Sequence, residues 1–201
     1  MLRDRTRRQV RSETELAEVV IEALRRLEAK LQGETPAAFD LWNTSPYRPK
    51  SENEMSNYVA RFLRDDLAER GVIIAREVEI RPSASTGGGE RTDIHVDVSV
   101  DIERNAQRFS VIVEVKGCWN RGLHNDMTGQ LARRYLRDNA SRTGVFLVGW
   151  FHCSAWDPQD YRKRACSDDP SKLASVLASE AATLRAEGFD IRPFVLNCSL
   201  R

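Results

Sequence analysis

Charged side chains alternate with apolar ones in two short segments of the 201-residue sequence. The first segment reads T-D-I-H-V-D-V from Thr92, and the second reads V-I-V-E-V-K-G from Val111. Two carboxylates, Asp93 and Glu114, can hold a hard divalent cation such as Mg²⁺ through their oxygens. A lysine two residues after the glutamate, Lys116, can orient or deprotonate a water, or neutralise charge on a phosphate. These residue types predict metal-assisted phosphate chemistry.

The alternation in both segments has a period of two, which indicates half-buried β-strands. Residues two apart share a face of a strand, so Glu114 and Lys116 point the same way, roughly 6–7 Å apart. The alternative interpretation is a pair of exposed strand faces with ordinary charges. Glu114 lies inside a strongly apolar run, where an unpartnered carboxylate would cost several kcal/mol. We therefore expect Asp93, Glu114 and Lys116 to converge at one end of a hairpin.

Asp93 followed by Glu114-Val115-Lys116 resembles the motif of the PD-(D/E)xK nuclease superfamily, which has the restriction-endonuclease-like fold. In that superfamily an aspartate opens one strand and a (D/E)-x-K triplet lies on the next. The present sequence has Thr92 where the motif name has proline. The order of the residues, the strand alternation and the surrounding elements carry the resemblance, which covers about half of the chain.

The resemblance implies a nuclease that hydrolyses phosphodiester bonds with Mg²⁺, with Mn²⁺ as a substitute and DNA as the expected substrate. Asp93 and Glu114 would bind the ion together with the backbone carbonyl of Val115. Lys116 would position the attacking water, and the products would carry a 5′-phosphate and a 3′-hydroxyl. Two alternatives stay open: an RNA-directed nuclease, and a non-catalytic module of the same fold that binds nucleic acid or protein.

Members of this superfamily often add a glutamate from a helix that precedes the sheet, and the sequence offers two candidates. A helix is predicted over about Ser51 to Arg70, where Glu54 forms a capping box with Ser51. At 100° per residue, Glu52 falls near the middle of the apolar stripe of this helix. A carboxylate on an inward face needs a cation or a proton. We therefore expect Glu52 to be a catalytic metal ligand and keep Glu54 as the alternative.

The helix predicted over about Asn125 to Asn139 supplies further candidates. Some superfamily members carry Q-x-x-x-Y after the (D/E)-x-K triplet. Here Gln130 is in place and is expected to orient the catalytic groups, but the tyrosine comes one residue late, as Tyr135, and its role stays open. At 100° per residue, Gln130 shares a face with three arginines that can bind nucleic-acid phosphates bidentately: Arg133, Arg134 and Arg137.

The apolar periodicity predicts the element order helix, helix, three strands, helix, strand, helix, strand. The continuous apolar run from Gly144 to Phe151 is typical of a strand buried on both faces. Together with the resemblance, this order predicts an α/β fold with an αβββαβ core, whose mixed sheet is flanked by helices. Residues 1–50, including a connecting loop over residues 34–50, would form an N-terminal helical extension. Residues 51–201 would form the nuclease domain, which ends in an extra helix and strand.

Composition limits the partners. The 31 basic and 30 acidic residues give a formal net charge of +1, so any basic surface must be local. The four cysteines show no metal-binding spacing and suggest no disulfide framework, which favours a reducing cytoplasm. No run of 18 apolar residues predicts a membrane span. The resemblance implies DNA as a partner, a homodimer that cuts both strands, and a place in a larger bacterial defence or repair protein.

Overall fold

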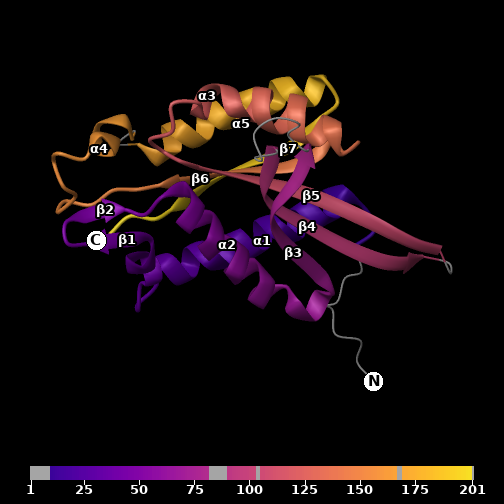
Figure 1. Ribbon diagram of the computed structural model, residues 1–201, viewed down its shortest axis with the longest axis horizontal. Helices are drawn as coiled ribbons and strands as arrows, with labels where there is room; N and C mark the ends of the chain where they lie inside the picture. Colours follow the sequence, from indigo (N-terminus) through magenta and orange to yellow (C-terminus); the bar gives the residue numbers. More distant parts are fainter. Residues whose placement is uncertain (1–9, 82–89, 103–104, 167–168, 201) are drawn as a thin grey trace.

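A five-stranded mixed sheet with helices on both faces forms the centre of the protein (Figure 1). The computed structural model describes the backbone of residues 10–81, 90–102, 105–166 and 169–200. Within these ranges, the side chains of residues 77–81, 90–93, 101–102 and 105 are outside the description. Among the described helices, none combines the length and the apolar character that crossing a membrane requires.

The strands follow the order β3-β4-β5-β6-β7 across the sheet. The first three form an antiparallel meander: β3 (Val72–Arg81), β4 (Glu90–Ile102) and β5 (Asn105–Gly117). The last two, β6 (Thr143–Trp150) and β7 (Asp190–Asn197), run parallel to β5. Every residue of β6 is buried, which confirms the central strand that its continuous apolar run predicted.

Helices form one layer on each face of the sheet. The layer drawn below the sheet in Figure 1 contains α1 (Glu13–Gln32) and α2 (Glu52–Asp66), whose apolar stripes pack on the odd-numbered valines of β5. The layer above it contains α3 (Leu123–Asp126), the π-helix η3 (Met127–Leu136) and α5 (Pro170–Ala186). Ile112 of β5 and Phe146 of β6 face this second layer. The two faces of β5 therefore belong to two different cores.

The predicted α/β class, the mixed sheet and the order of the main elements are confirmed. The expected plain loop over residues 34–50 is wrong, because it contains the 3-10 helix η1 (Ala37–Leu41) and a hairpin of β1 (Trp42–Thr44) and β2 (Tyr47–Pro49). Trp42 anchors this hairpin: it packs edge-on against Trp156 and donates from Nε1 to the carbonyl of Cys198 at 2.8 Å. The second predicted helix ends earlier than expected, and the 3-10 helix η2 (Ala68–Arg70) follows it.

The cysteine spacing suggested no disulfide framework, but the structure contains a disulfide. Cys118, directly after β5, is bonded to Cys166, directly after the short helix α4 (Tyr161–Ala165). The two cysteines are 48 residues apart, and cysteine connectivity cannot be read from sequence spacing alone. Cys153 and Cys198 are buried free thiols.

Candidate active site

The ammonium group of Lys116 lies at the centre of a cluster of polar side chains near the end of β5. Its Nζ is 2.9 Å from Oε1 of Glu114 and 3.1 Å from Oδ2 of Asp126. It also donates to Oε1 of Gln130 at 2.9 Å. An ammonium group has three N–H donors, so these three oxygens match its full donor capacity. The side chains of Glu114 and Lys116 are only 1% and 9% exposed, respectively, which makes this a buried cluster.

The neighbours of Lys116 determine its charge. Burial alone would lower the pKa of this lysine. The charge of Glu114 and the hydrogen bonds to Glu114 and Asp126 outweigh burial and raise the pKa above its ordinary value of 10.5. Lys116 is therefore an ammonium ion at neutral pH and holds its protons firmly. Such a group can neutralise developing negative charge, but it is poorly suited to remove a proton from water.

The π-helix η3 positions Gln130 against this lysine. Gln130 Nε2 donates to the hydroxyl of Tyr135 at 2.6 Å, while its Oε1 accepts from Lys116. In an α-helix, residues three and four apart share a face, whereas a π-helix forms i→i+5 bonds. The extra residue before Tyr135, which departs from the Q-x-x-x-Y spacing, is thus accommodated by the helix type. Tyr135 is buried, and its hydroxyl is hydrogen-bonded to Gln130.

Asp126 is a site residue that the sequence reasoning missed. It ends α3 and leads into η3, and its carboxylate reaches Lys116. It also lies close to Gly122, where an added Cβ would meet the carboxylate of Asp126. A side chain at position 122 would therefore displace this carboxylate. An aspartate ten residues after Lys116 gives no periodic signal, and only the folding back of the loop brings it to the lysine.

Glu52 reaches the end of β5 from α2, which belongs to the layer of helices on the opposite face of the sheet from η3. It is in the first turn of α2, and its Oε1 accepts from the backbone N–H of Gly117 at 2.8 Å and from Asn120 Nδ2 at 2.9 Å. Gly117 directly follows Lys116, so Glu52 meets the strand where it ends. Glu54 instead closes the predicted capping box with Ser51, which the structure confirms. Of the two candidate glutamates, only Glu52 contacts the described segment that follows the Glu-x-Lys triplet.

Two predicted metal ligands have backbone positions consistent with the site. Asp93 lies in β4, and its neighbour Ile94 is paired with Val113, the neighbour of Glu114. The side chain of Asp93 is outside the described residues. Val115 lies between Glu114 and Lys116, with its side chain in the core against α1 and α2. That Asp93 and the carbonyl of Val115 bind a metal ion stays a prediction.

His95 and Asp97 occupy the same face of the sheet as Glu114. They pair with Ile112 and Ser110 of β5, and opposite residues of an antiparallel pair share a face. Asp97 accepts from Arg108 Nη2 at 2.8 Å. His95 Nε2 is 3.7 Å from Asp97 Oδ1, too far for a hydrogen bond. Burial lowers the pKa of His95, so this imidazole is neutral at neutral pH.

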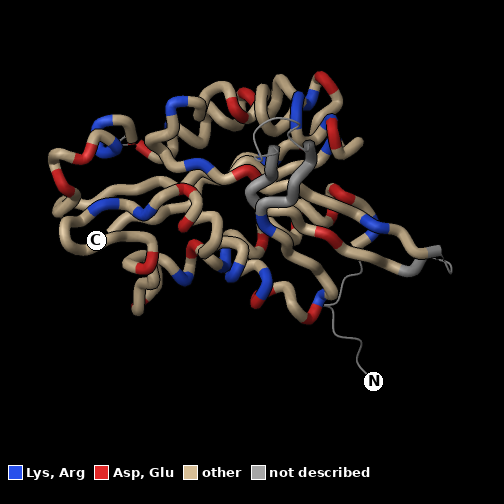
Figure 2. The backbone as a smooth tube through the Cα atoms, viewed as in Figure 1, with Lys and Arg blue, Asp and Glu red and all other residues tan. Residues whose placement is uncertain are grey.

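The arginines expected to bind nucleic acid are more exposed than Gln130. All three are exposed: Arg133, Arg134 and Arg137. Nη2 of Arg133 lies 3.5 Å from Oε2 of Glu187. Gln130 is half-buried and accepts from Lys116, whereas the arginines are exposed. The face that the sequence predicted for all four side chains stays a prediction. The prediction assumed 100° per residue, which a π-helix does not follow. Figure 2 shows both signs of charge along this layer of helices.

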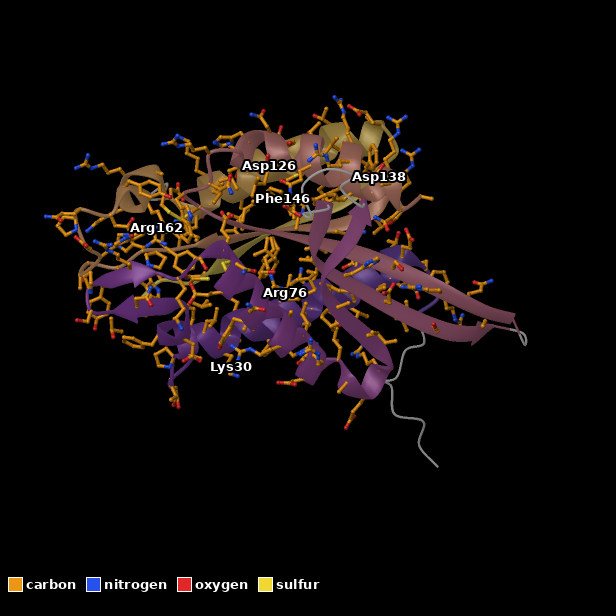
Figure 3. All side chains as sticks on the ribbon, viewed as in Figure 1. Lys30, Arg76, Asp126, Asp138, Phe146 and Arg162 are labelled. Carbon is orange, nitrogen blue, oxygen red and sulfur yellow. A yellow bond between two sulfur atoms is a disulfide. The ribbon has the colours of Figure 1, made fainter. Side chains whose placement is uncertain are left out.

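The donor chemistry of the cluster suits a hard divalent cation. Glu114 and Asp126 already approach one positive charge, the ammonium of Lys116, through carboxylate oxygens, the ligand type that Mg²⁺ prefers. Figure 3 labels Asp126 on the upper side of the sheet. Within the described side chains, no three histidines, cysteines, aspartates or glutamates are grouped around one metal position. A complete ligand set would therefore need Asp93 or groups from water and substrate.

Comparisons with known proteins give one weak structural likeness. No protein-family model matches the chain, and no curated protein matches its sequence. A solved structure described as MspJI restriction endonuclease in complex with a 27-mer oligonucleotide aligns with a TM-score of 0.29 and 10% sequence identity. The alignment covers 95% of this chain and 33% of that chain, so the present chain spans about a third of its length. This TM-score is too low to establish a shared fold, so the chemistry rests on the residues of the site.

Proposed function

We propose that the chain is a metal-dependent nuclease of the PD-(D/E)xK type, which hydrolyses phosphodiester bonds in DNA. The observation that carries this proposal is the buried ammonium of Lys116, which is held by Glu114, Asp126 and Gln130 where β5 ends. Burying a cation beside carboxylates costs desolvation free energy, and only well-placed partners offset that cost. An active site that must bind both a cation and a phosphate needs such a combination.

Lys116 would act through its charge. Its raised pKa keeps it protonated, so the ammonium would stabilise negative charge on the phosphate in the transition state and orient the attacking water. Gln130 and Asp126 would hold the ammonium in position, and Tyr135 would hold Gln130. In this assignment Lys116 is the catalytic residue, and Tyr135 acts only through Gln130.

The proposed metal ligands are Asp93, Glu114, the carbonyl of Val115 and Glu52. A Mg²⁺ ion, or Mn²⁺ in its place, would lower the pKa of a bound water and offset charge on the leaving oxygen. The carboxylate of Glu52 would join them from the first turn of α2, next to Gly117 where β5 ends. The backbone of Asp93 supports its assignment, because it lies beside the Ile94–Val113 pair.

DNA is the proposed substrate, and the exposed arginines Arg133, Arg134 and Arg137 are its proposed phosphate contacts. An RNA substrate is the alternative, and a panel of matched DNA and RNA oligonucleotides would separate the two. The resemblance further suggests a homodimer and a role in a larger bacterial defence or repair protein. A mass measurement in solution that finds only monomer would remove the dimer.

A second candidate function is a non-catalytic module that binds nucleic acid. The same ammonium favours it, because all three donors of Lys116 are used and little of the side chain is exposed. A closed network of this kind can also be purely structural. The two functions differ in one observable: only the nuclease changes its substrate covalently.

Cleavage of supercoiled plasmid tests the proposal. Wild-type protein and Asp93→Ala are incubated with plasmid in Mg²⁺ or in EDTA. We expect nicked or linear product only with wild-type protein and Mg²⁺. Equal cleavage by Asp93→Ala, or cleavage in EDTA, would contradict the proposed site. Absence of product on plasmid, linear, single-stranded and RNA substrates would favour the binding module.

A further inference from the structure

A pocket of about 770 Å³ opens beside the candidate active site, at the end of the molecule that carries α4 and the β1–β2 hairpin. Its wall on the β5 side is the segment from Trp119 to Arg121, which directly follows Cys118. A second part of its wall is the segment from Gln159 to Arg162, at the start of α4. The first turn of α2 and Arg48 complete it. The nuclease proposal leaves this pocket unused, except for Glu52.

A disulfide and a cation–π contact link these two segments, and a hydrogen bond ties α4 to β2. The Cys118–Cys166 disulfide joins the residue before Trp119 to the residue after α4. The guanidinium of Arg162 lies 5.1 Å from the centre of the Trp119 ring, and its Nη1 donates to the carbonyl of Pro49 at 2.7 Å. Figure 3 labels Arg162, which belongs to α4. The pocket is thus lined by cross-linked segments, which reduces the ordering cost of binding a ligand there.

Most charges in the pocket are already paired. Arg48 binds Asp157 at 2.6 Å, Arg162 binds Asp160 at 2.8 Å, and Glu52 accepts from Gly117 and Asn120. Arg121 differs: it is exposed and makes no hydrogen bond or ion pair with the described residues. The pocket therefore offers one guanidinium that is available to an anion.

An exposed aromatic ring, Tyr161, also lines this pocket. Tyr161 is 66% exposed, and its hydroxyl makes no hydrogen bond within the described part of the chain. A large aromatic side chain with this exposure has an open face on which another ring can stack. Base–aromatic stacking is the general way in which proteins hold unpaired nucleotides, and arginine is the general partner of their phosphates.

We infer that this pocket binds one unpaired nucleotide of a DNA strand, with its base stacked on Tyr161 and a phosphate bound by Arg121. The link to the candidate active site is Glu52, which lines the pocket and also binds Gly117, the residue after Lys116. A nucleotide held here would fix the position of the strand relative to Lys116. The inference rests on the proposed function, because it names the part of the substrate that the site recognises.

Binding in EDTA tests the inference without any cleavage. Fluorescence anisotropy measures the affinity of wild-type protein for a fluorescein-labelled, single-stranded 15-mer. We expect Tyr161→Ala to weaken binding between about 5-fold and 100-fold, the effect of losing one stacked base. Tyr161→Phe, which keeps the ring, should bind as wild type does. Phe39→Ala is the matched control, since Phe39 is 48% exposed in η1, outside the residues that line the pocket.

The phosphate contact has its own readout. Arg121→Ala should lower the slope of log affinity against log salt by about 0.7, the value for one phosphate on a single strand. Arg25→Ala, an exposed arginine of α1, should leave the slope unchanged. A free mononucleotide, dAMP, serves as competitor. If dAMP displaces the 15-mer only at a concentration far above that of the 15-mer, the pocket binds a nucleotide within a strand. Displacement at equal concentration would overturn that assignment and identify a mononucleotide pocket.

The outcomes separate this inference from the nuclease proposal. Unchanged affinity in Tyr161→Ala, or no binding by the wild type, overturns the inference. Tyr161-dependent binding without cleavage under any metal condition keeps the inference and removes the nuclease. Metal-dependent cleavage with unchanged affinity and rate in Tyr161→Ala keeps the nuclease and removes the pocket from substrate recognition.

Discussion

Gln130 donates from its side-chain amide to the hydroxyl of Tyr135 at 2.6 Å, across five residues of the π-helix η3. The other end of the same amide accepts from Lys116. Tyr135, Gln130 and Lys116 therefore form one hydrogen-bonded chain that runs from the buried side of η3 to the end of β5. A π-helix is rare and is frequently found at functional sites. Here it lets a glutamine and a tyrosine with unusual spacing act on one lysine.

Removing the tyrosine hydroxyl should disturb this chain without opening the core. In Tyr135→Phe the ring keeps its packing, but Gln130 loses an acceptor, and a typical hydrogen bond contributes about 0.5–1.5 kcal/mol. If this loss appears in the transition state, kcat falls about 2-fold to 10-fold, while KM changes little. Single-turnover and steady-state kinetics on a labelled duplex measure both. A change confined to KM would show that Tyr135 does not act through Lys116.

Lys116 should contribute to stability as well as to activity. In Lys116→Met the carboxylate of Glu114 stays buried without its cation, which should lower the free energy of unfolding by about 3–5 kcal/mol. The double variant Glu114→Gln/Lys116→Met removes both charges and should recover most of the loss. Urea unfolding measures all three proteins. Lys172→Met on α5 is the exposed control, and a loss in it equal to that of Lys116→Met would contradict the buried ion pair.

The free energy of unfolding should decrease as the pH is lowered, in a window set by His95. Burial lowers the pKa of His95 below its ordinary value of 6.5, against the opposing charge of Asp97. The unfolded chain therefore binds more protons than the folded one below pH 6.5, and the free energy of unfolding decreases as pH falls through this range. Asp97, which is paired with Arg108, has its pKa lowered from 3.8 and titrates in a separate, more acidic window. Urea unfolding between about pH 8 and pH 5 should show a flatter profile for His95→Asn; identical slopes would contradict this assignment.

Two arginines of η3 and the arginine directly after it, here called the η3 segment, should contribute affinity for nucleic acid but no base preference. Arg133, Arg134 and Arg137 are exposed, so each can reach a phosphate. Their triple alanine variant should weaken duplex binding and lower the salt slope by about 0.9 for each phosphate that the protein no longer binds. Anisotropy at several salt concentrations measures the slope. A variant with three exposed arginines replaced elsewhere, Arg25, Arg64 and Arg142, is the control, and an equal loss in it would argue against the η3 segment as the interface.

Local patterns in the sequence were sufficient to predict most of the fold. Period-two alternation indicated β4 and β5, and the apolar run after Gly144 indicated a strand buried on both faces. Helical stripes and the Ser51–Glu54 capping box indicated α2. The β1–β2 hairpin was missed, because its strands are three residues each and are held by Trp42, which packs on Trp156 from a distant part of the sequence.

The candidate site was only partly predictable, because part of it depends on contacts distant in sequence. Strand alternation placed Glu114 and Lys116 on one face. Asp126 reaches Lys116 only because the loop after β5 folds back over the sheet. Gln130 and Tyr135 meet only because the helix is of the π type, which a calculation at 100° per residue excludes. The Cys118–Cys166 disulfide likewise joins residues 48 positions apart, and no local pattern marks that pair.

The central claim is that Glu114 and Lys116 form a catalytic site, and the cleavage rate of Glu114→Gln tests it most directly. Supercoiled plasmid is incubated with a saturating concentration of Mg²⁺ and with wild type, Glu114→Gln or Glu69→Gln, an exposed glutamate of η2. Circular dichroism shows beforehand that all three proteins are folded. We expect wild type and Glu69→Gln to cut at the same rate and Glu114→Gln to lose at least about 100-fold, since it loses a charged group that would bind the metal ion. A folded Glu114→Gln that cuts as fast as wild type would contradict the claim.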